Sequence, residues 1–456
     1  MNKKYCIIVI SIFLLIKLLT LNFYKNIWWD SAVYIGMGKY IYSLGNAGLW
    51  ENTRPIILPL LLGFLWKTGL NLTIIRVVEI VFGSLCILLV YLIGKKLFDE
   101  KIALVSSILL AISPTFFFFN GIILTEVVST FFALLGIFYL TNQKKYLSGF
   151  FFGIAFLTRF IQLFVFIAVI LTLLIQINKK NVKNLFKLII GFIIAIAPFL
   201  ILNYVLYNSV LFPFLQQISL SKISGWLNFR PPTYYFIELF KENFLYLLSI
   251  FGGLLIFKNK DREKMLPVAA FFLLFMFFNL IKQKEMRFLI ILFPYMYLLV
   301  SYSLMHFLDY FKKIIAKKIL IILIIASIIT SLNTSHIYYK NELNKNNKYD
   351  SLQNKFEENN INGKIWISNP IIPILSNKKI DKLVYYPVFN ENNQKALIKE
   401  AENADFIFID SCDLACKSSD LECEDNKNEL LLFLKKELKI IYSSEFDKCS
   451  QFIFQR

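Results

Sequence analysis

The chain has 456 residues, of which 57% are hydrophobic and 17% aromatic, and it carries a formal net charge of +18. Its mean hydropathy is +0.59. This composition, with many apolar runs of bilayer length, predicts a polytopic α-helical membrane protein and excludes a water-soluble enzyme. Residues 1–335 contain 32 Lys and Arg against 12 Asp and Glu. The positive charge lies in short turns between apolar runs, which is typical of cytoplasmic loops and does not indicate nucleic-acid binding.

Basic turns divide the apolar sequence into spans. Lys3 and Lys4 precede the first apolar run and place the N-terminus in the cytoplasm. Later basic clusters mark further cytoplasmic turns, and the sequence between them is long enough to cross the membrane twice. Arg159 interrupts the run 146–178, which therefore predicts two short spans with Arg159 at their outer turn. We expect about eleven transmembrane helices, at 5–23, 74–94, 102–119, 122–140, 146–158, 161–177, 187–207, 240–257, 265–281, 288–308 and 319–335.

The C-terminal part has a different composition. Since the number of spans is odd, residues 336–456 are predicted to form an extracytoplasmic domain, separate from the transmembrane domain 1–335. Its alternating runs at 364–368, 383–386, 405–410 and 440–443 indicate strands, and helix-like stretches near 392–403 and 427–437 complete a small α/β domain. The Asn- and Lys-rich stretch 340–360 is its linker.

Four cysteines lie in this C-terminal domain: Cys412, Cys416, Cys423 and Cys449. They predict two disulfides, which fit an oxidising compartment. The pairing does not follow from the sequence. A zinc site is the alternative, although the gaps between the cysteines lack the short paired spacing of zinc ribbons and fingers.

The predicted topology places a set of polar side chains on the outer side. Asp30 follows the first span, Glu51 and Arg54 lie in the first outer loop, and Glu126 opens the fourth span. Lys284 and Arg287, between the ninth and tenth spans, violate the positive-inside rule. Either the topology is wrong, or these cations snorkel, or they bind an anion, for which a lipid phosphate is the obvious candidate at this depth.

Simpler structural roles compete with each functional one. Asp30 could cap a helix, Glu126 could favour a helix N-terminus through the macrodipole, and Arg159 could snorkel to the interface. Trp28 and Trp29 fit an interfacial aromatic belt.

A series of short motifs lies in order over about residues 25–300. They are Trp29-Asp30-Ser31-Ala32-Val33-Tyr34, Arg54-Pro55 with Pro59, Ser113-Pro114, Leu124-Thr125-Glu126, the run from Gly149 to Arg159, Pro198 with Asn203, and Arg287-Phe288 with Pro294. In order and spacing they resemble the GT-C glycosyltransferases, and in particular the group of protein O-mannosyltransferases and bacterial aminoarabinose transferases.

The resemblance implies transfer of a sugar from a polyprenyl- or dolichyl-phosphate carrier to a protein, lipid or glycan acceptor on the outer face of the cell membrane. It implies Asp30 as the general base of an inverting displacement, with Glu126 in support. Further expected site residues are Arg54, Arg159, Arg287 and Lys284 for the phosphate and Tyr34, Glu51, Gln217 and Tyr235 for the substrate cavity. No cofactor is certain, and a divalent metal ion is left open. Many relatives carry a second acidic residue where this chain has Ser31.

Three other functions stay open. A transporter or flippase of lipid-linked sugars would explain many spans and outer cations, but charged or broken helices at mid-membrane and a two-fold repeat are not evident. An oligosaccharyltransferase shares the membrane architecture, although its Trp-Trp-Asp motif belongs to the soluble domain and Trp28-Trp29-Asp30 lies near the opposite end of this chain. A non-catalytic membrane protein with a disulfide-bonded ectodomain is the third.

Overall fold

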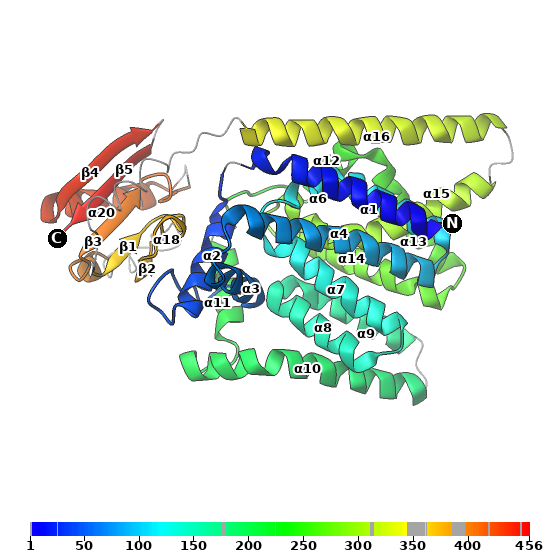
Figure 1. Ribbon diagram of the computed structural model, residues 1–456, viewed down its shortest axis with the longest axis horizontal. Helices are drawn as coiled ribbons and strands as arrows, with labels where there is room; N and C mark the ends of the chain where they lie inside the picture. Colours follow the sequence, from blue (N-terminus) through cyan, green and yellow to red (C-terminus); the bar gives the residue numbers. More distant parts are fainter. Residues whose placement is uncertain are drawn as a thin grey trace.

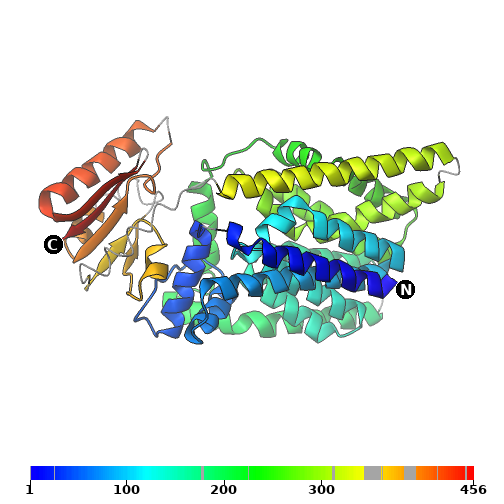
Figure 2. The ribbon, with the colours of Figure 1, turned by 45° about the horizontal axis from the view of Figure 1, so that its top comes forward.

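The computed structural model describes residues 2–24, 26–175, 179–223, 225–310, 314–343, 361, 363–384, 397–417, 420–446 and 449–456. Long helices form a bundle, and a small α/β domain lies at one end of it (Figures 1 and 2). The predicted fold class, a polytopic helical membrane protein with a small C-terminal sheet domain, is confirmed.

The bundle contains helices of very different length. They are α1 (Asn2–Leu19), α2 (Trp29–Tyr42), α3 (Ile57–Lys67), α4 (Leu72–Leu97), α5 (Glu100–Ile112), α6 (Pro114–Phe119), α7 (Thr125–Thr141), α8 (Lys145–Thr158), α9 (Leu163–Ile175), α10 (Lys179–Tyr207), α11 (Phe212–Ile223), α12 (Tyr234–Glu242), α13 (Leu248–Lys258), α14 (Met265–Leu280), α15 (Phe293–Tyr310) and α16 (Ile314–Leu343). Short 3-10 turns lie at Leu21–Phe23, Phe160–Gln162, Phe244–Leu247, Arg262–Lys264 and Met286–Ile291.

Each of the eleven predicted spans overlaps at least one of these helices. Within the described residues, four helical segments are long and apolar enough to cross a membrane by themselves: Leu72–Leu97, Val182–Tyr207, Arg262–Leu280 and Ile321–Leu343. Several other predicted spans are shorter or broken. The span at 102–119, for example, is split where Ser113 ends α5 and caps α6, whose first residue is Pro114.

The stretch around Arg159 folds as the sequence indicated. Helix α8 ends at Thr158, Arg159 has extended backbone angles, and α9 begins at Leu163. An arginine between two apolar helices keeps its charge at the helix ends and leaves both helices free to pack.

The predicted first outer loop, between the first two spans, is largely helical. It contains α2 and α3, which pack against each other at Gly38 and Gly63, where a Cβ on Gly38 would lie 2.6 Å from the Gly63 nitrogen. Only two facing glycines let the backbones approach so closely. Asp30 therefore lies in the first turn of a packed helix and not in a mobile connection.

The C-terminal domain contains a five-stranded sheet in the order β2-β1-β3-β5-β4. The strands are β1 (Ile365–Ile367), β2 (Lys382–Leu383), β3 (Phe406–Asp410), β4 (Lys439–Phe446) and β5 (Cys449–Gln455), and the helices include α18 (Ile372–Leu375) and α20 (Leu421–Glu437). Strand β1 pairs in parallel with β2 and β3, whereas β5 is antiparallel to β3 and β4. The sequence indicated the other four strands but not β5. Residues 344–360, 385–386 and 392–396 of the predicted linker, strand and helix lie outside the described residues.

Both faces of this sheet are buried. Side chains on one face of the sheet, including those of Trp366 and Ile407, pack with α20. Those on the other face, including Ile367 and Phe408, form one core with Val33 and Met37 of α2. The period of two along each strand thus gives the domain its own core on one side and a docking face for the bundle on the other.

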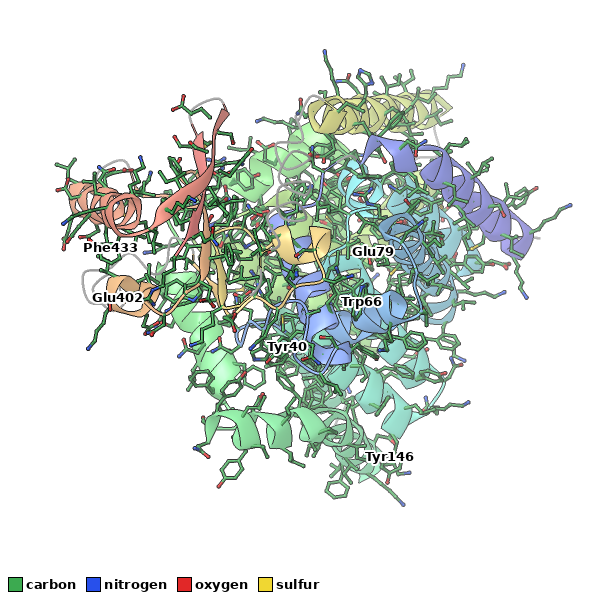
Figure 3. The ribbon with its side chains drawn as sticks, turned by 60° about the vertical axis from the view of Figure 1, so that its left-hand side comes forward. Tyr40, Trp66, Glu79, Tyr146, Glu402 and Phe433 are labelled. Carbon is green, nitrogen blue, oxygen red and sulfur yellow. A yellow bond between two sulfur atoms is a disulfide. The ribbon has the colours of Figure 1, made fainter. Side chains whose placement is uncertain are left out.

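Polar contacts fix this docking. The Lys39 ammonium of α2 is buried and donates to the carbonyl oxygens of Pro373 and Ile374, at 2.9 and 3.0 Å, and to the Asn377 side chain. Gly48 forms a backbone bridge to the loop before β2, with a φ of +85° that favours glycine. Figure 3 looks from the side of the soluble domain, which Glu402 and Phe433 mark, toward Tyr40 of α2 and Trp66 of α3.

The four cysteines of the domain form two disulfides, Cys412 with Cys449 and Cys416 with Cys423. The thiols of Cys6 and Cys86 are free and buried in the bundle. The disulfides tie the segment after β3 to β5 and to α20.

The disulfides and the predicted outward orientation can be tested together. In a Cys6→Ser/Cys86→Ser background, we expect a membrane-impermeant maleimide added to intact cells to label the protein only after reduction, because all four remaining thiols are oxidised and outside. Labelling is measured as a mass shift. Labelling without reductant would contradict the disulfides, and labelling of reduced protein only after membrane permeabilisation would contradict the orientation.

Candidate active site

A cavity of about 460 Å³ lies where the bundle meets the soluble domain. Seven separate stretches of the chain line it, from α2, the turn before α3, the start of α7, the turn after α8, α11 with its following loop, the loop before α15, and the segment after β3. The charged residues in its wall are Asp30, Arg54, Glu126, Arg159, Glu285, Arg287 and Asp413. Residues more than 380 positions apart in sequence thus share one pocket.

Asp30 is held by two arginines. Arg54 Nη1 lies 2.9 Å from Asp30 Oδ1, and Arg287 Nη1 lies 2.8 Å from Asp30 Oδ2. Burial alone would raise the pKa of Asp30, but Arg54 and Arg287 outweigh it and hold the pKa well below its usual value. Asp30 is therefore a carboxylate at any physiological pH.

Glu126 forms the second ion-pair centre. It lies in the first turn of α7, and its Oε1 is 3.2 Å from Arg159 Nη1 and 3.7 Å from Arg287 Nε. Arg159 Nη1 also donates to the Thr125 hydroxyl at 2.8 Å. Glu126 is only 1% exposed. A carboxylate at this position interacts favourably with the helix macrodipole and also forms ion pairs with the arginines of the cavity.

Arg287 joins the two centres. Besides Asp30 and Glu126, it pairs with Glu285, whose Oε2 lies 2.7 Å from Arg287 Nε. Its guanidinium also lies 5.4 Å from the ring centre of Phe288, and that of Arg159 lies 5.2 Å from the same ring. The aromatic ring and three carboxylates together compensate the cost of burying this cation.

The remaining predicted site residues divide into three groups. Tyr34 and Gln217 line the cavity, and the Tyr34 ring lies beneath the Arg54 guanidinium at 5.7 Å. Glu51 and Tyr235 lie outside the wall and support it, since Glu51 pairs with Arg54 Nε at 3.3 Å and the Tyr235 hydroxyl bonds the backbone of Glu285. Lys284 does neither. Its buried ammonium donates to the carbonyl oxygen of Ile281, and burial lowers its pKa.

Ser31 points away from the cavity. It lines a separate, much smaller cavity beside Arg76. Because neighbouring residues on an α-helix differ by about 100° in direction, the side chain after Asp30 faces another part of the structure. A second acid at this position would not enter the cavity as the helix stands.

Two charged residues of the cavity wall, Glu285 and Asp413, are not among the site residues expected from the sequence. Glu285 has extended backbone angles and lies two residues before Arg287, a spacing that places both side chains on the same side and was available as a signal. Asp413 had no signal, because it reaches the cavity only through docking of the soluble domain. Its carboxylate accepts from the Ser368 hydroxyl and the Asn369 amide, each at 3.0 Å.

The residues provide poor metal sites in their present arrangement. Carboxylate oxygens of Asp30, Glu126 and Glu285 are the ligand type that hard divalent cations prefer, but each of these carboxylates already pairs with an arginine. Asp410, Cys412 and Cys449 also lie together, with ligand atoms within 4.8 Å of one another. Both of those sulfurs belong to one disulfide, so this group does not fit a thiolate site.

Comparisons with known proteins agree with this architecture. Residues 53–202 match the family model of dolichyl-phosphate-mannose-protein mannosyltransferases, a stretch that includes Arg54, Glu126 and Arg159. No curated protein sequence matches the chain.

Several solved structures are similar over nearly the whole chain. ArnT from Cupriavidus metallidurans bound to undecaprenyl phosphate has a TM-score of 0.64 at 9% identity, covering 99% of this chain and 98% of that one. The archaeal oligosaccharyltransferase AglB from Archaeoglobus fulgidus, in complex with an inhibitory peptide and a dolichol-phosphate, has a TM-score of 0.62 at 12% identity, covering 98% of this chain and 74% of that one. The chain therefore has the GT-C fold, as its motifs indicated.

The ion-pair network predicts a strong stability effect. Replacing Arg287 by Met leaves Asp30, Glu126 and Glu285 without their shared cation, so we expect a loss of about 3 kcal/mol in the free energy of unfolding. Lys241→Met, which removes one member of an exposed pair with Glu238, should cost less than about 0.5 kcal/mol. Thermal melting of both variants in detergent checks this, and equal melting temperatures would contradict a central role for Arg287.

Proposed function

We propose that this protein is a membrane glycosyltransferase that moves a sugar from a polyprenyl-phosphate carrier to an acceptor on the outer face of the membrane. The observation that carries the proposal is the convergence of Asp30 with Arg54 and Arg287 in one cavity at the junction of bundle and soluble domain. The family-model match and the GT-C fold support the same class of reaction.

In the proposed reaction, the acceptor hydroxyl oxygen attacks the anomeric carbon while the bond from that carbon to the carrier phosphate breaks. The electron pair of the broken bond leaves with the phosphate, and Asp30 takes the hydroxyl proton. Attack and departure on opposite faces invert the anomeric centre without a covalent sugar intermediate.

The leaving phosphate gains negative charge, which fixed cations in a partly dehydrated cavity stabilise. Arg54, Arg159 and Arg287 are assigned to this role because they line the cavity and because a planar guanidinium can donate to two phosphate oxygens at once. Glu126 positions Arg159 and Arg287, and Tyr34 and Gln217 complete the wall. Lys284 is assigned no direct contact with the phosphate, because its ammonium turns toward Ile281.

Removal of the base tests the assignment. Asp30→Asn preserves the shape of the side chain but cannot accept the proton, so we expect transfer from a short-chain polyprenyl-phosphate sugar to fall at least about 100-fold. Turnover is measured on purified protein, with Glu400→Gln, an exposed substitution in the soluble domain, as the control. Turnover of Asp30→Asn at the level of the wild type would refute the assignment of the base.

The pH profile provides a separate test. Arg54 lowers the pKa of Asp30, so Arg54→Gln should raise that pKa and move the acid limb of kcat/KM to higher pH. In the wild-type enzyme Asp30 is already ionised, so kcat/KM should not fall because of Asp30 protonation at any pH above about 4. Arg230→Gln, which changes an exposed arginine outside the cavity wall, should leave the profile in place. An unshifted limb in Arg54→Gln would argue against Asp30 as the titrating base.

A further inference from the structure

The arginines assigned to the carrier phosphate are already engaged. Arg54 pairs with Asp30 and Glu51, Arg159 pairs with Glu126, and Arg287 pairs with Asp30, Glu126 and Glu285. Three guanidinium groups thus face four carboxylates, which leaves one excess negative charge in the cluster. An incoming anion gains little from such a cluster unless one of the carboxylates gives up its place.

The geometry identifies Asp30 as the carboxylate to be displaced. Each of its two oxygens is held by a different arginine, at 2.9 and 2.8 Å, so it occupies the space between Arg54 and Arg287 that a tetrahedral phosphate would bridge. Asp30 is also the more accessible of the two carboxylates at the centre, with a side chain 22% exposed against 1% for Glu126. Glu51, Glu126 and Glu285 hold the same arginines from their other sides.

We propose that the carrier phosphate exchanges with Asp30 on Arg54 and Arg287, and that this exchange releases Asp30 to act as the base. This inference rests on the proposed function and adds how binding of the carrier controls the basicity of Asp30. In the free protein both Asp30 oxygens accept from guanidinium groups, which makes the carboxylate a weak base. When phosphate takes its place, Asp30 loses two cations and gains a neighbouring negative charge, and its affinity for a proton rises.

This exchange makes the base depend on the donor. Without a carrier phosphate, Asp30 is an ion-paired carboxylate that abstracts protons poorly. With the carrier bound, the same carboxylate is basic and lies beside the sugar. Asp30 therefore pairs with the arginines before the carrier binds and serves as the base once the carrier is bound.

If Asp30 helped to bind the phosphate, its replacement would weaken binding. The exchange predicts the opposite result, namely tighter binding. If Asp30 competes with phosphate, Asp30→Asn should bind farnesyl phosphate at least about fivefold more tightly than the wild type, although its sugar transfer is reduced. Glu51→Gln, which removes a competing carboxylate from Arg54 but leaves the base, should also bind farnesyl phosphate more tightly, by at least about twofold. Glu400→Gln, the same chemical change far from the cavity, should bind as the wild type does.

Affinity is measured by calorimetry in detergent micelles, with thermal melting to verify that each variant is folded and with farnesol to separate phosphate binding from binding of the chain. Equal or weaker binding of farnesyl phosphate by both folded variants would overturn the exchange while leaving the proposed function intact. Failure of the wild type to prefer farnesyl phosphate over farnesol would overturn the lipid-phosphate carrier itself, and the exchange with it.

Discussion

The cavity depends on one buried cation. Arg287 lies at the start of a 3-10 turn and pairs with carboxylates from three places: the first turn of α2, the first turn of α7 and its own loop. A guanidinium in so little water is tolerated only when its donors are satisfied, so the surrounding elements must come together in one arrangement. The same requirement explains why an arginine rather than a lysine stands here, since only a planar fork serves several carboxylates at fixed angles.

A second constraint comes from the soluble domain. Its sheet uses one face for its own core and the other for α2, so the domain cannot leave without exposing Ile367, Phe408 and their neighbours to water. The same helix α2 carries Asp30 at its N-terminal end and Lys39, the buried docking lysine, near its C-terminal end. The position of the candidate base is thereby coupled to a domain more than 300 residues away in sequence.

Hydropathy and charge predicted much of this architecture. The apolar runs identified a helix in every predicted span, and the break at Arg159 followed from one charge in the middle of a run. The candidate list also brought together Asp30, Arg54, Glu126, Arg159 and Arg287, because charged residues at span ends have few structural roles and tend to meet. These predictions depend on local composition, which the sequence contains in full.

What the sequence did not reveal depends on contacts between distant segments. The helices α2 and α3 are too short to be recognised as spans from hydropathy, and the glycine contact that joins them is visible only in three dimensions. Asp413 reaches the cavity through a docking face that no periodicity identifies. The direction of the Lys284 side chain is likewise not visible in the sequence, which shows a charge suited to phosphate, whereas the side chain turns inward to a carbonyl oxygen.

The bundle and the soluble domain contribute different side chains to the cavity wall, and under the proposed function this difference assigns them to different substrates. The arginines lie on helices and turns of the bundle, where a carrier with a hydrocarbon chain has its lowest free energy. The soluble domain contributes Cys412, Asp413 and Ala415 to the wall, which present a carboxylate and small side chains. A phosphate is repelled by Asp413 and pairs with Arg54 and Arg287 once Asp30 has given up its place there, whereas an acceptor hydroxyl can donate to Asp413. The carrier would then contact the part of the wall that the bundle forms, and the acceptor the part that the soluble domain forms. Both would be held in the cavity that Asp30 lines, as proton transfer from the acceptor to Asp30 requires.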